Sequence, residues 1–183
     1  MPPAKAPIDL PPSAGLSIIK RGPQNFAGRK LGLLLTDGAD AGVVQALIAA
    51  TEAEGALYEV VAPHVAGVTL SDGSFLPGKQ KVDGGPSVLY DAVAVVVSAE
   101  GAPLLAMDKT AKDFVSDAYA HCKFMAYVPE AQPFLERAGV TSADLDEGVI
   151  ALDGPSAASA FLAACGQVRL WAREAKVDLD AIA

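Results

Sequence analysis

Apolar positions along the chain form short continuous runs that alternate with segments of helical period. Runs of the kind found in buried strands occupy residues 30–36, 56–63, 90–98, 123–128 and 147–152. Apolar residues spaced three or four apart predict helices over residues 43–54, 103–120, 131–138 and 156–176. Because strands and helices alternate, the pattern favours an α/β fold with a mainly parallel sheet and helices on both faces.

One stretch within this pattern alternates in the manner of a hairpin. Residues 67–78, GVTLSDGSFLPG, alternate on both sides of Asp72-Gly73, and Asp-Gly is a preferred two-residue turn. We therefore expect a β-hairpin inserted into a doubly wound, flavodoxin-like sheet. The polar and proline signals of residues 153–156 mark the start of the closing helix. The core contacts expected from that helix are Phe161, Leu162, Val168 and Trp171.

The first 27 residues differ from the rest because they lack a helical period and carry six prolines: Pro2, Pro3, Pro7, Pro11, Pro12 and Pro23. Such a composition is typical of a linker or a wrapping arm. We therefore divide the chain into an arm, residues 1–28, and a flavodoxin-like domain, residues 29–183. A start of this kind is expected inside a longer polypeptide, at a domain boundary.

Composition and charge narrow the class of protein. Hydrophobic residues make up 51% of the 183, which indicates a globular chain with a substantial core. No apolar run approaches the roughly 20 residues of a membrane span, and the start lacks the apolar core of a secretory signal. We therefore expect a soluble chain without a targeting signal or membrane partner, of unknown compartment. The net charge of −8 repels phosphate backbones, so we expect no nucleic-acid partner.

Ligands of such sheets bind beyond the carboxyl ends of the strands, and the first strand ends in Thr36-Asp37-Gly38-Ala39-Asp40. Two carboxylates would oppose a flavin phosphate. A phospho-acceptor site would also need an aspartate after the third long strand, where Ser98-Ala99-Glu100 stands. We interpret Asp37 and Asp40 as a solvated turn with a helix cap. The stretch Gly84-Gly85-Pro86-Ser87 precedes a strand, so we interpret it as a turn and not as a phosphate loop.

The sequence offers little material for a nucleophile or a metal site. His121 and Cys122 stand before a strand and not at its carboxyl end, which favours a structural cysteine beside an incidental histidine. His64 has no evident partner, and Cys165 stands among small residues of the closing helix, where it packs closely. With two histidines and two cysteines in total, we expect no metal site and no catalytic triad.

Five segments resemble, in order and spacing, the carboxy-terminal domain of large-subunit haem catalases. They are GLSIIKRGPQNFAGRKLGLLLTDG, GVTLSDGSFLPG, GGPSVLYDAVAVV, DEGVI and QVRLWAREAKVD, and the resemblance extends from Leu16 to the end. It implies a flavodoxin-like fold of the type-1 glutamine-amidotransferase-like superfamily. That superfamily also holds small proteases, deglycase-like proteins and holding chaperones.

The resemblance also bears on the strand that ends in Val128-Pro129-Glu130. Active members of the superfamily carry a cysteine, usually followed by histidine, in a tight elbow after this strand. Here Pro129 and Glu130 stand at the matching positions, and proline offers neither a nucleophile nor an amide donor. The superfamily's partner glutamate falls near residues 40–44, where the acidic residue is Asp40. We therefore expect a degenerate elbow without catalytic residues, in a shallow polar cleft between Ser98, Glu100 and Glu130.

The resemblance implies a function within a larger enzyme. Large-subunit catalases convert hydrogen peroxide to water and oxygen with a haem held in an amino-terminal core, so this chain is expected to bind no cofactor. Its tyrosines are interpreted as packing residues: Tyr58, Tyr90, Tyr119 and Tyr127. The expected function is a non-catalytic domain that contacts the catalase core, stabilises the tetramer and holds unfolded client proteins without ATP. The alternative is a stand-alone hydrolase or deglycase.

Overall fold

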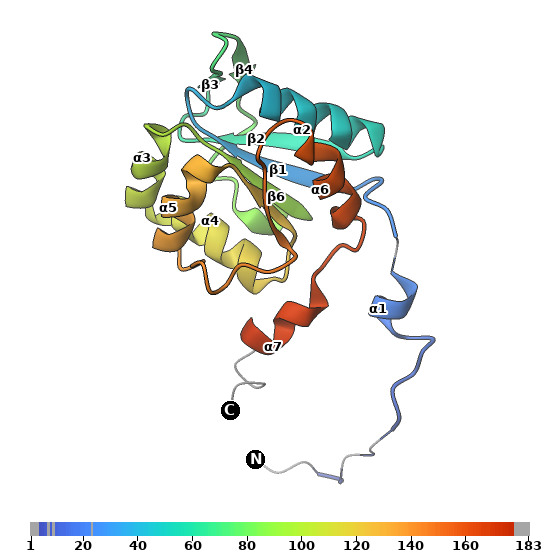
Figure 1. Cartoon of the computed structure of the whole chain (residues 1–183). Helices are drawn as coiled ribbons and strands as arrows, with labels where there is room; N and C mark the ends of the chain where they lie inside the picture. The colour runs from blue at the N-terminus through green and yellow to red at the C-terminus, as the bar shows by residue number, and fades with distance from the viewer. Residues whose placement is uncertain (1–3, 7, 9, 23, 178–183) are drawn as a thin grey trace.

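A six-stranded parallel sheet forms the centre of the computed structural model, which describes residues 4–6, 8, 10–22 and 24–177 (Figure 1). The strand order is β5-β2-β1-β6-β7-β8. The strands are β1 (Lys30–Leu35), β2 (Leu57–Ala62), β5 (Gln80–Lys81), β6 (Ala92–Val96), β7 (Met125–Tyr127) and β8 (Val149–Ala151). All five pairings in this sheet are parallel. The mainly parallel sheet predicted from the sequence is confirmed.

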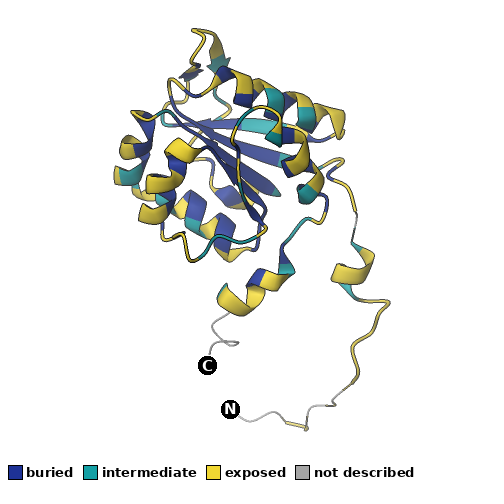
Figure 2. Ribbon diagram, viewed as in Figure 1, coloured by how far each residue is buried: buried dark blue, intermediate teal, exposed yellow. Residues whose placement is uncertain are grey.

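Helices cover both faces of the sheet. One face carries α2 (Ala41–Ala53) and α6 (Ala157–Cys165), which contact each other. The other carries α3 (Gly101–Met107), α4 (Lys109–Ala120) and α5 (Gln132–Arg137). Because helices shield both faces, every residue of β6 is buried and the sheet is the darkest part of Figure 2. The doubly wound arrangement is therefore confirmed.

Tyr90 shows how closely the sheet is packed. A Cβ added to Gly32 in β1 would lie 2.5 Å from the Tyr90 ring, so only glycine leaves room for the ring. The Tyr90 hydroxyl donates to Glu59, at 3.3 Å. Tyr119 and Tyr127 are also buried and Tyr58 is half-buried, as expected of packing residues.

The predicted hairpin is present but stands apart from the main sheet. Strands β3 (Gly67–Thr69) and β4 (Phe75–Pro77) pair antiparallel and form a two-stranded sheet of their own. The sequence pattern missed β5, whose two residues are too few to show a period. It also missed the short 3-10 helix η1 (Ser87–Leu89), which follows the glycine turn.

The single helix predicted over residues 103–120 is in fact two helices, α3 and α4, so the prediction of one continuous helix was wrong. Asp108 has extended backbone angles, φ −80° and ψ 123°, which end α3. Its carboxylate then accepts hydrogen bonds from the Thr110 amide, at 2.8 Å, and the Ala111 amide, at 3.3 Å. Asp108 is therefore the N-cap of α4.

The closing helix predicted over residues 156–176 is also broken. Helix α6 ends at Cys165, Val168 has a left-handed φ of 69°, and two short helices follow, η3 (Trp171–Arg173) and α7 (Glu174–Val177). Phe161 and Leu162 are buried as predicted, but Val168 and Trp171 are only half-buried, so their assignment to the core was wrong. Tertiary hydrogen bonds break the helix: the segment after α6 turns so that Leu170 and Arg173 can bond to the carbonyls of Cys122 and Lys123, just before β7.

The arm is more structured than its sequence pattern indicates. It contains a one-turn helix, α1 (Ile18–Arg21), in which the Ser17 hydroxyl accepts from the Lys20 amide at 3.3 Å. Phe26 is fully buried, so the last part of the arm packs with the domain. In the described residues, no helix is both long and apolar enough to cross a membrane.

Candidate functional site

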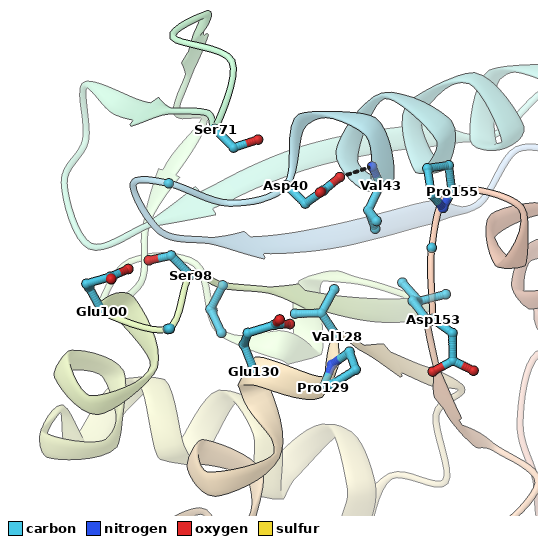
Figure 3. Close-up of a pocket in the computed structure, with 15 residues that line it drawn as sticks. Asp40, Val43, Ser71, Ser98, Glu100, Val128, Pro129, Glu130, Asp153 and Pro155 are labelled. Atoms are coloured by element: carbon cyan, nitrogen blue, oxygen red, sulfur yellow. Dashed lines mark hydrogen bonds between the residues drawn. The ribbon is translucent and has the colours of Figure 1, made fainter.

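A cleft of about 550 Å³ lies at the carboxyl ends of the strands, where the loops after β1, β6, β7 and β8 meet (Figure 3). Ser98, Glu100 and Glu130 all line it, so the structure brings the three residues of the expected polar cleft together. Asp40 and Asp153 border it as well. Among the described residues that line the cleft, none is a cysteine, histidine, lysine or arginine.

Pro129 occupies the junction between β7 and the helix that follows. Val128 is extended, with φ −82° and ψ 153°, and Pro129 begins a 3-10 helix, η2 (Pro129–Ala131). A proline fits this first position because its fixed φ suits a helix start and its missing amide hydrogen is not needed there. Among the described residues other than glycine, a positive φ occurs only at Cys122 and Val168. The turn at Pro129 therefore lacks the strain of a nucleophile elbow.

Three backbone amides near the cleft, those of Gly38, Ala41 and Gly101, are engaged within the protein. The Gly38 amide donates to the Thr69 carbonyl at 2.8 Å. The Gly101 amide donates to the Ser98 hydroxyl at 3.0 Å and the Ala41 amide to the Ser71 hydroxyl, also at 3.0 Å. These amides hold loops together and do not point as free donors toward a reacting oxygen.

The two carboxylates after β1 have structural partners. Asp40 Oδ1 accepts from the Val43 amide at 2.7 Å, the contact drawn in Figure 3, and so caps α2. Asp37 accepts from the Thr69 amide at 2.8 Å and ties the loop to the hairpin. The exposed turn with a helix cap expected here is confirmed. Asp40 is the acidic residue nearest in sequence to the expected partner position, and its hydrogen bond leaves it poorly suited to activate a nucleophile.

Both thiols lie outside the cleft. Cys122 is buried just before β7, at the opposite end of the strand from Pro129, and burial raises the pKa of its thiol. Cys165 is fully buried in α6, and burial raises its pKa strongly. Since a thiolate is the nucleophilic form, burial disfavours both cysteines as nucleophiles. His64 and His121 are exposed, and in the described part of the chain no three acidic, histidine or cysteine side chains cluster as metal ligands would.

The sequence analysis missed a charged cluster at the amino ends of the strands. Arg173 is fully buried and forms a two-point ion pair with Asp146: Nε–Oδ2 and Nη2–Oδ1 are both 2.8 Å. Burial works to raise the pKa of Asp146, but the hydrogen bonds and charge of Arg173 outweigh it and the pKa is lowered. The guanidinium also lies 4.4 Å from the centre of the Tyr119 ring.

Lys123 is a second buried cation in this cluster. Its Nζ donates to the carbonyls of Ser87, the first residue of η1, and Tyr90, which follows η1. Burial, together with the charge of Arg169, lowers its pKa to about 8. The Ser87 hydroxyl is the one buried side-chain polar atom without a hydrogen bond in the described residues. Because the ammonium group of Lys123 binds backbone carbonyls and faces no reacting group, we assign Lys123 a structural role.

Solved structures that resemble this chain share its fold at low sequence identity. Oxidized DJ-1 of Toxoplasma gondii gives a TM-score of 0.65 at 14% identity, over 85% of this chain and 98% of that one. DJ-1beta of Drosophila melanogaster gives 0.65 at 12% identity, with the same coverage of both chains. These likenesses confirm the flavodoxin-like fold.

Sequence relatives are catalases. Catalase C of Rhizobium meliloti (strain 1021) is 54% identical over 171 residues, which cover 93% of this chain and 24% of that protein. Catalase HPII of Pseudomonas putida is 31% identical over 176 residues, covering 96% of this chain and 22% of that protein. The chain thus spans about a quarter of the length of these relatives. A family model of the C-terminal domain found in long catalases matches residues 27–175. The resemblance seen in the sequence is therefore confirmed, and this chain belongs to the family of C-terminal domains of long catalases.

Proposed function

We propose that this chain is the non-catalytic C-terminal domain of a long haem catalase, whose separate core converts hydrogen peroxide to water and oxygen. The observation that carries the proposal is Pro129 at the elbow, in an unstrained turn. The cleft beside it has no thiol or imidazole among the described residues that line it. A domain without its own chemistry contributes through contacts. We assign it a stabilising function in the catalase tetramer, through packing against the core and neighbouring subunits.

Two of the four tyrosines, Tyr90 and Tyr119, are poorly suited to bind haem iron. Iron binding requires a tyrosinate, yet burial raises the pKa of both Tyr90 and Tyr119. Their hydroxyls are also engaged: Tyr90 donates to Glu59 and Tyr119 donates to the Asp144 carbonyl at 3.0 Å. The proposal therefore assigns haem to the core and no cofactor to this chain.

Two observations test the proposal. The chain mixed with equimolar haem should give no Soret band of a bound haem and should evolve no oxygen from hydrogen peroxide. The coding sequence around this stretch should encode a catalase core on the amino-terminal side. Stoichiometric haem binding with oxygen evolution, or a surrounding gene without a catalase core, would contradict the proposal.

Exposed apolar side chains favour client holding as a second function. Large apolar residues at least 48% exposed occur on several elements of the domain: Leu57, Val65, Phe75, Val88, Leu89, Leu104 and Met107. Such side chains can bind the apolar segments of an unfolding protein. The net charge of −8 would keep the loaded complex in solution. We propose that the domain holds unfolded clients without ATP.

The alternative, a hydrolase or deglycase acting alone, is not favoured. It needs a nucleophile, a partner acid and oxyanion donors at the elbow. The position carries Pro129, the nearby Asp40 caps α2, and the amides of Gly38 and Gly101 are bonded within the protein.

A further inference from the structure

The segment after α6 crosses the amino ends of three neighbouring strands. Three of its long-range bonds reach residues that stand shortly before a strand begins. Arg169 Nη1 donates to the Asp91 carbonyl, before β6, at 3.0 Å. The Leu170 amide donates to the Cys122 carbonyl, before β7, at 2.8 Å. Arg173 binds Asp146, before β8. The segment is therefore fixed to one edge of the sheet.

The arm reaches the same edge. The Gly28 amide donates to the Gly55 carbonyl, shortly before β2, at 3.0 Å, and Arg29, the first residue after the arm, forms an ion pair with Asp91 at 3.3 Å. A Cβ at Gly166 would lie 3.1 Å from the Gln24 carbonyl oxygen, so the arm touches the turn after α6. Helices α1 and α7 both lie beyond this edge, on one side of the sheet (Figure 1).

Two cavities open beside the closing segment, and the arm lines the smaller one. One, of about 250 Å³, lies between α1 and the turn at Val168, and the other, of about 390 Å³, lies between Cys122 and α7. Arg169 and Trp171 line both cavities. We name the surface around them the amino-end surface; it consists of Ile18, Ile19, Val168, Arg169, Trp171 and Val177.

This surface is held in place but is not covered. Neither α1 nor α7, each four residues long, buries a residue, and both are yellow along most of their length in Figure 2. Ile18 and Ile19 are 67% and 58% exposed. Helices this short are unstable in water without tertiary contacts. The buried Arg173 fixes one side of the surface, and the other side is exposed in this chain.

The charge of the amino-end surface is opposite to that of the protein as a whole. The smaller cavity is lined by Arg169 and by Arg29, which is paired with Asp91, and α1 adds the two cations Lys20 and Arg21. Glu174 is the acidic residue that lines the larger cavity. The cleft at the other edge of the sheet carries four carboxylates: Asp40, Glu100, Glu130 and Asp153. A partner of the amino-end surface would therefore be apolar with acidic groups.

We infer that the amino-end surface packs against the catalase part of the long polypeptide. The inference rests on the proposed function. Its occupant follows from the comparisons: the relatives are about four times as long, and the matching family is a C-terminal domain. The catalase part then joins the domain through the arm, which is bound to this edge of the sheet. Packing there would cover α1 and Trp171 and would leave open the cleft at the carboxyl ends of the strands.

Oxidative footprinting of two side chains tests the inference. Trp171 lies in the amino-end surface, and Met107 lies at the other edge, 75% exposed in α3. The 183-residue chain and the haem-loaded long catalase are exposed to hydroxyl radicals, and oxidation of the two peptides is measured by mass spectrometry. In the long catalase we expect Trp171 oxidation to fall at least about fivefold, since an interface core excludes water. Met107 oxidation should stay unchanged.

Two matched variants of the long catalase, one in the amino-end surface and one in α3, give a second test. Ile19→Asp should raise Trp171 oxidation toward that of the short chain, while Leu104→Asp, at a site 61% exposed in α3, should not. Equal Trp171 oxidation in both proteins, or protection of Met107 in its place, would overturn the assignment of the surface. A gene without a catalase core would instead overturn the proposed function, so the two failures are distinguishable.

Discussion

Arg173 and Asp146 join the closing segment to the loop before β8 by two parallel hydrogen bonds of 2.8 Å, with the Arg173 side chain entirely shielded from solvent. Removing the carboxylate would leave a buried guanidinium without its counter-charge. We expect Asp146→Asn to lower the free energy of unfolding by about 3–5 kcal/mol, measured by urea denaturation.

The control is the exposed ion pair between Lys81 and Asp83, whose side chains are 49% and 51% exposed. Asp83→Asn should leave the urea midpoint almost unchanged, because solvent screens such pairs. Equal effects of the two substitutions would show that Arg173 does not hold the closing segment.

Lys123 should make stability depend on pH in the alkaline range. Its pKa of about 8 lies below the ordinary 10.5, so the unfolded chain binds the proton more tightly than the folded one. Burial of the charge therefore destabilises the fold below pH 8, and this cost is relieved as pH rises from about 8 to about 10.5.

The buried cysteines and tyrosines titrate in the same range, so the measurement is a comparison with Lys123→Met. Between pH 7 and pH 10.5, the unfolding free energy of the wild type should gain about 2–3 kcal/mol relative to the variant. Parallel pH profiles of the two proteins would mean that Lys123 stays charged, or is hydrated, in the folded chain.

The elbow should not regain chemistry by substitution of its two residues. We expect Pro129→Cys with Glu130→His to hydrolyse a p-nitrophenyl ester no faster than Pro129→Ala, and to leave methylglyoxal unchanged. The turn is unstrained and the nearby Asp40 is bound to the Val43 amide, so the new thiol would lack both the strained elbow and a free acidic partner. Turnover by the double variant that saturates with substrate would show that the site is intact apart from its nucleophile.

The reactivity of the two native thiols gives a second test of where the elbow lies. Cys122 and Cys165 should react with iodoacetamide at least about tenfold more slowly than free glutathione, because burial keeps both protonated. Labelling of Cys122 at the rate of a catalytic thiolate would mean that the reactive position lies before β7 and not after it.

Client holding should depend on exposed apolar residues and not on the thiols. At near-stoichiometric ratios, the chain should suppress light scattering by an unrelated heat-labile enzyme, and Leu104→Glu with Met107→Glu should weaken this protection. Ser159→Glu with Ala160→Glu adds the same charge to exposed, less apolar positions of α6 and should not. Protection no greater than that from an equally acidic inert protein would leave the stabilising function alone.

The sheet could be predicted from the sequence because its strands are buried on both faces and therefore read as continuous apolar runs, as in residues 92–96. The cleft followed from topology, since parallel strands end at one edge of the sheet. The break at Asp108 had a readable signal, an aspartate two residues before Thr110 in a good capping position. The assignment of Pro129 to the nucleophile position required the family resemblance, because a proline by itself indicates only the start of a helix.

The charged cluster and the closing segment could not be predicted in the same way. Arg173 binds groups at residues 119, 123 and 146, which are brought to it by the folded sheet. Residues 156–176 have a helical pattern, yet the Leu170 amide bonds to Cys122 and Val168 takes a left-handed φ. Tertiary contacts of this kind override local propensity and leave no periodic signal.

Deletion of this domain from the long catalase tests the central claim most directly. An inter-domain contact of ordinary size, about 600–1,500 Å², is enough to stabilise a tetramer but is remote from the haem. We expect the truncated, haem-loaded protein to unfold at least about 5 °C lower while its peroxide turnover per haem changes less than about twofold. Unchanged thermal stability, or loss of turnover in a truncated protein that is still tetrameric and haem-loaded, would contradict the account.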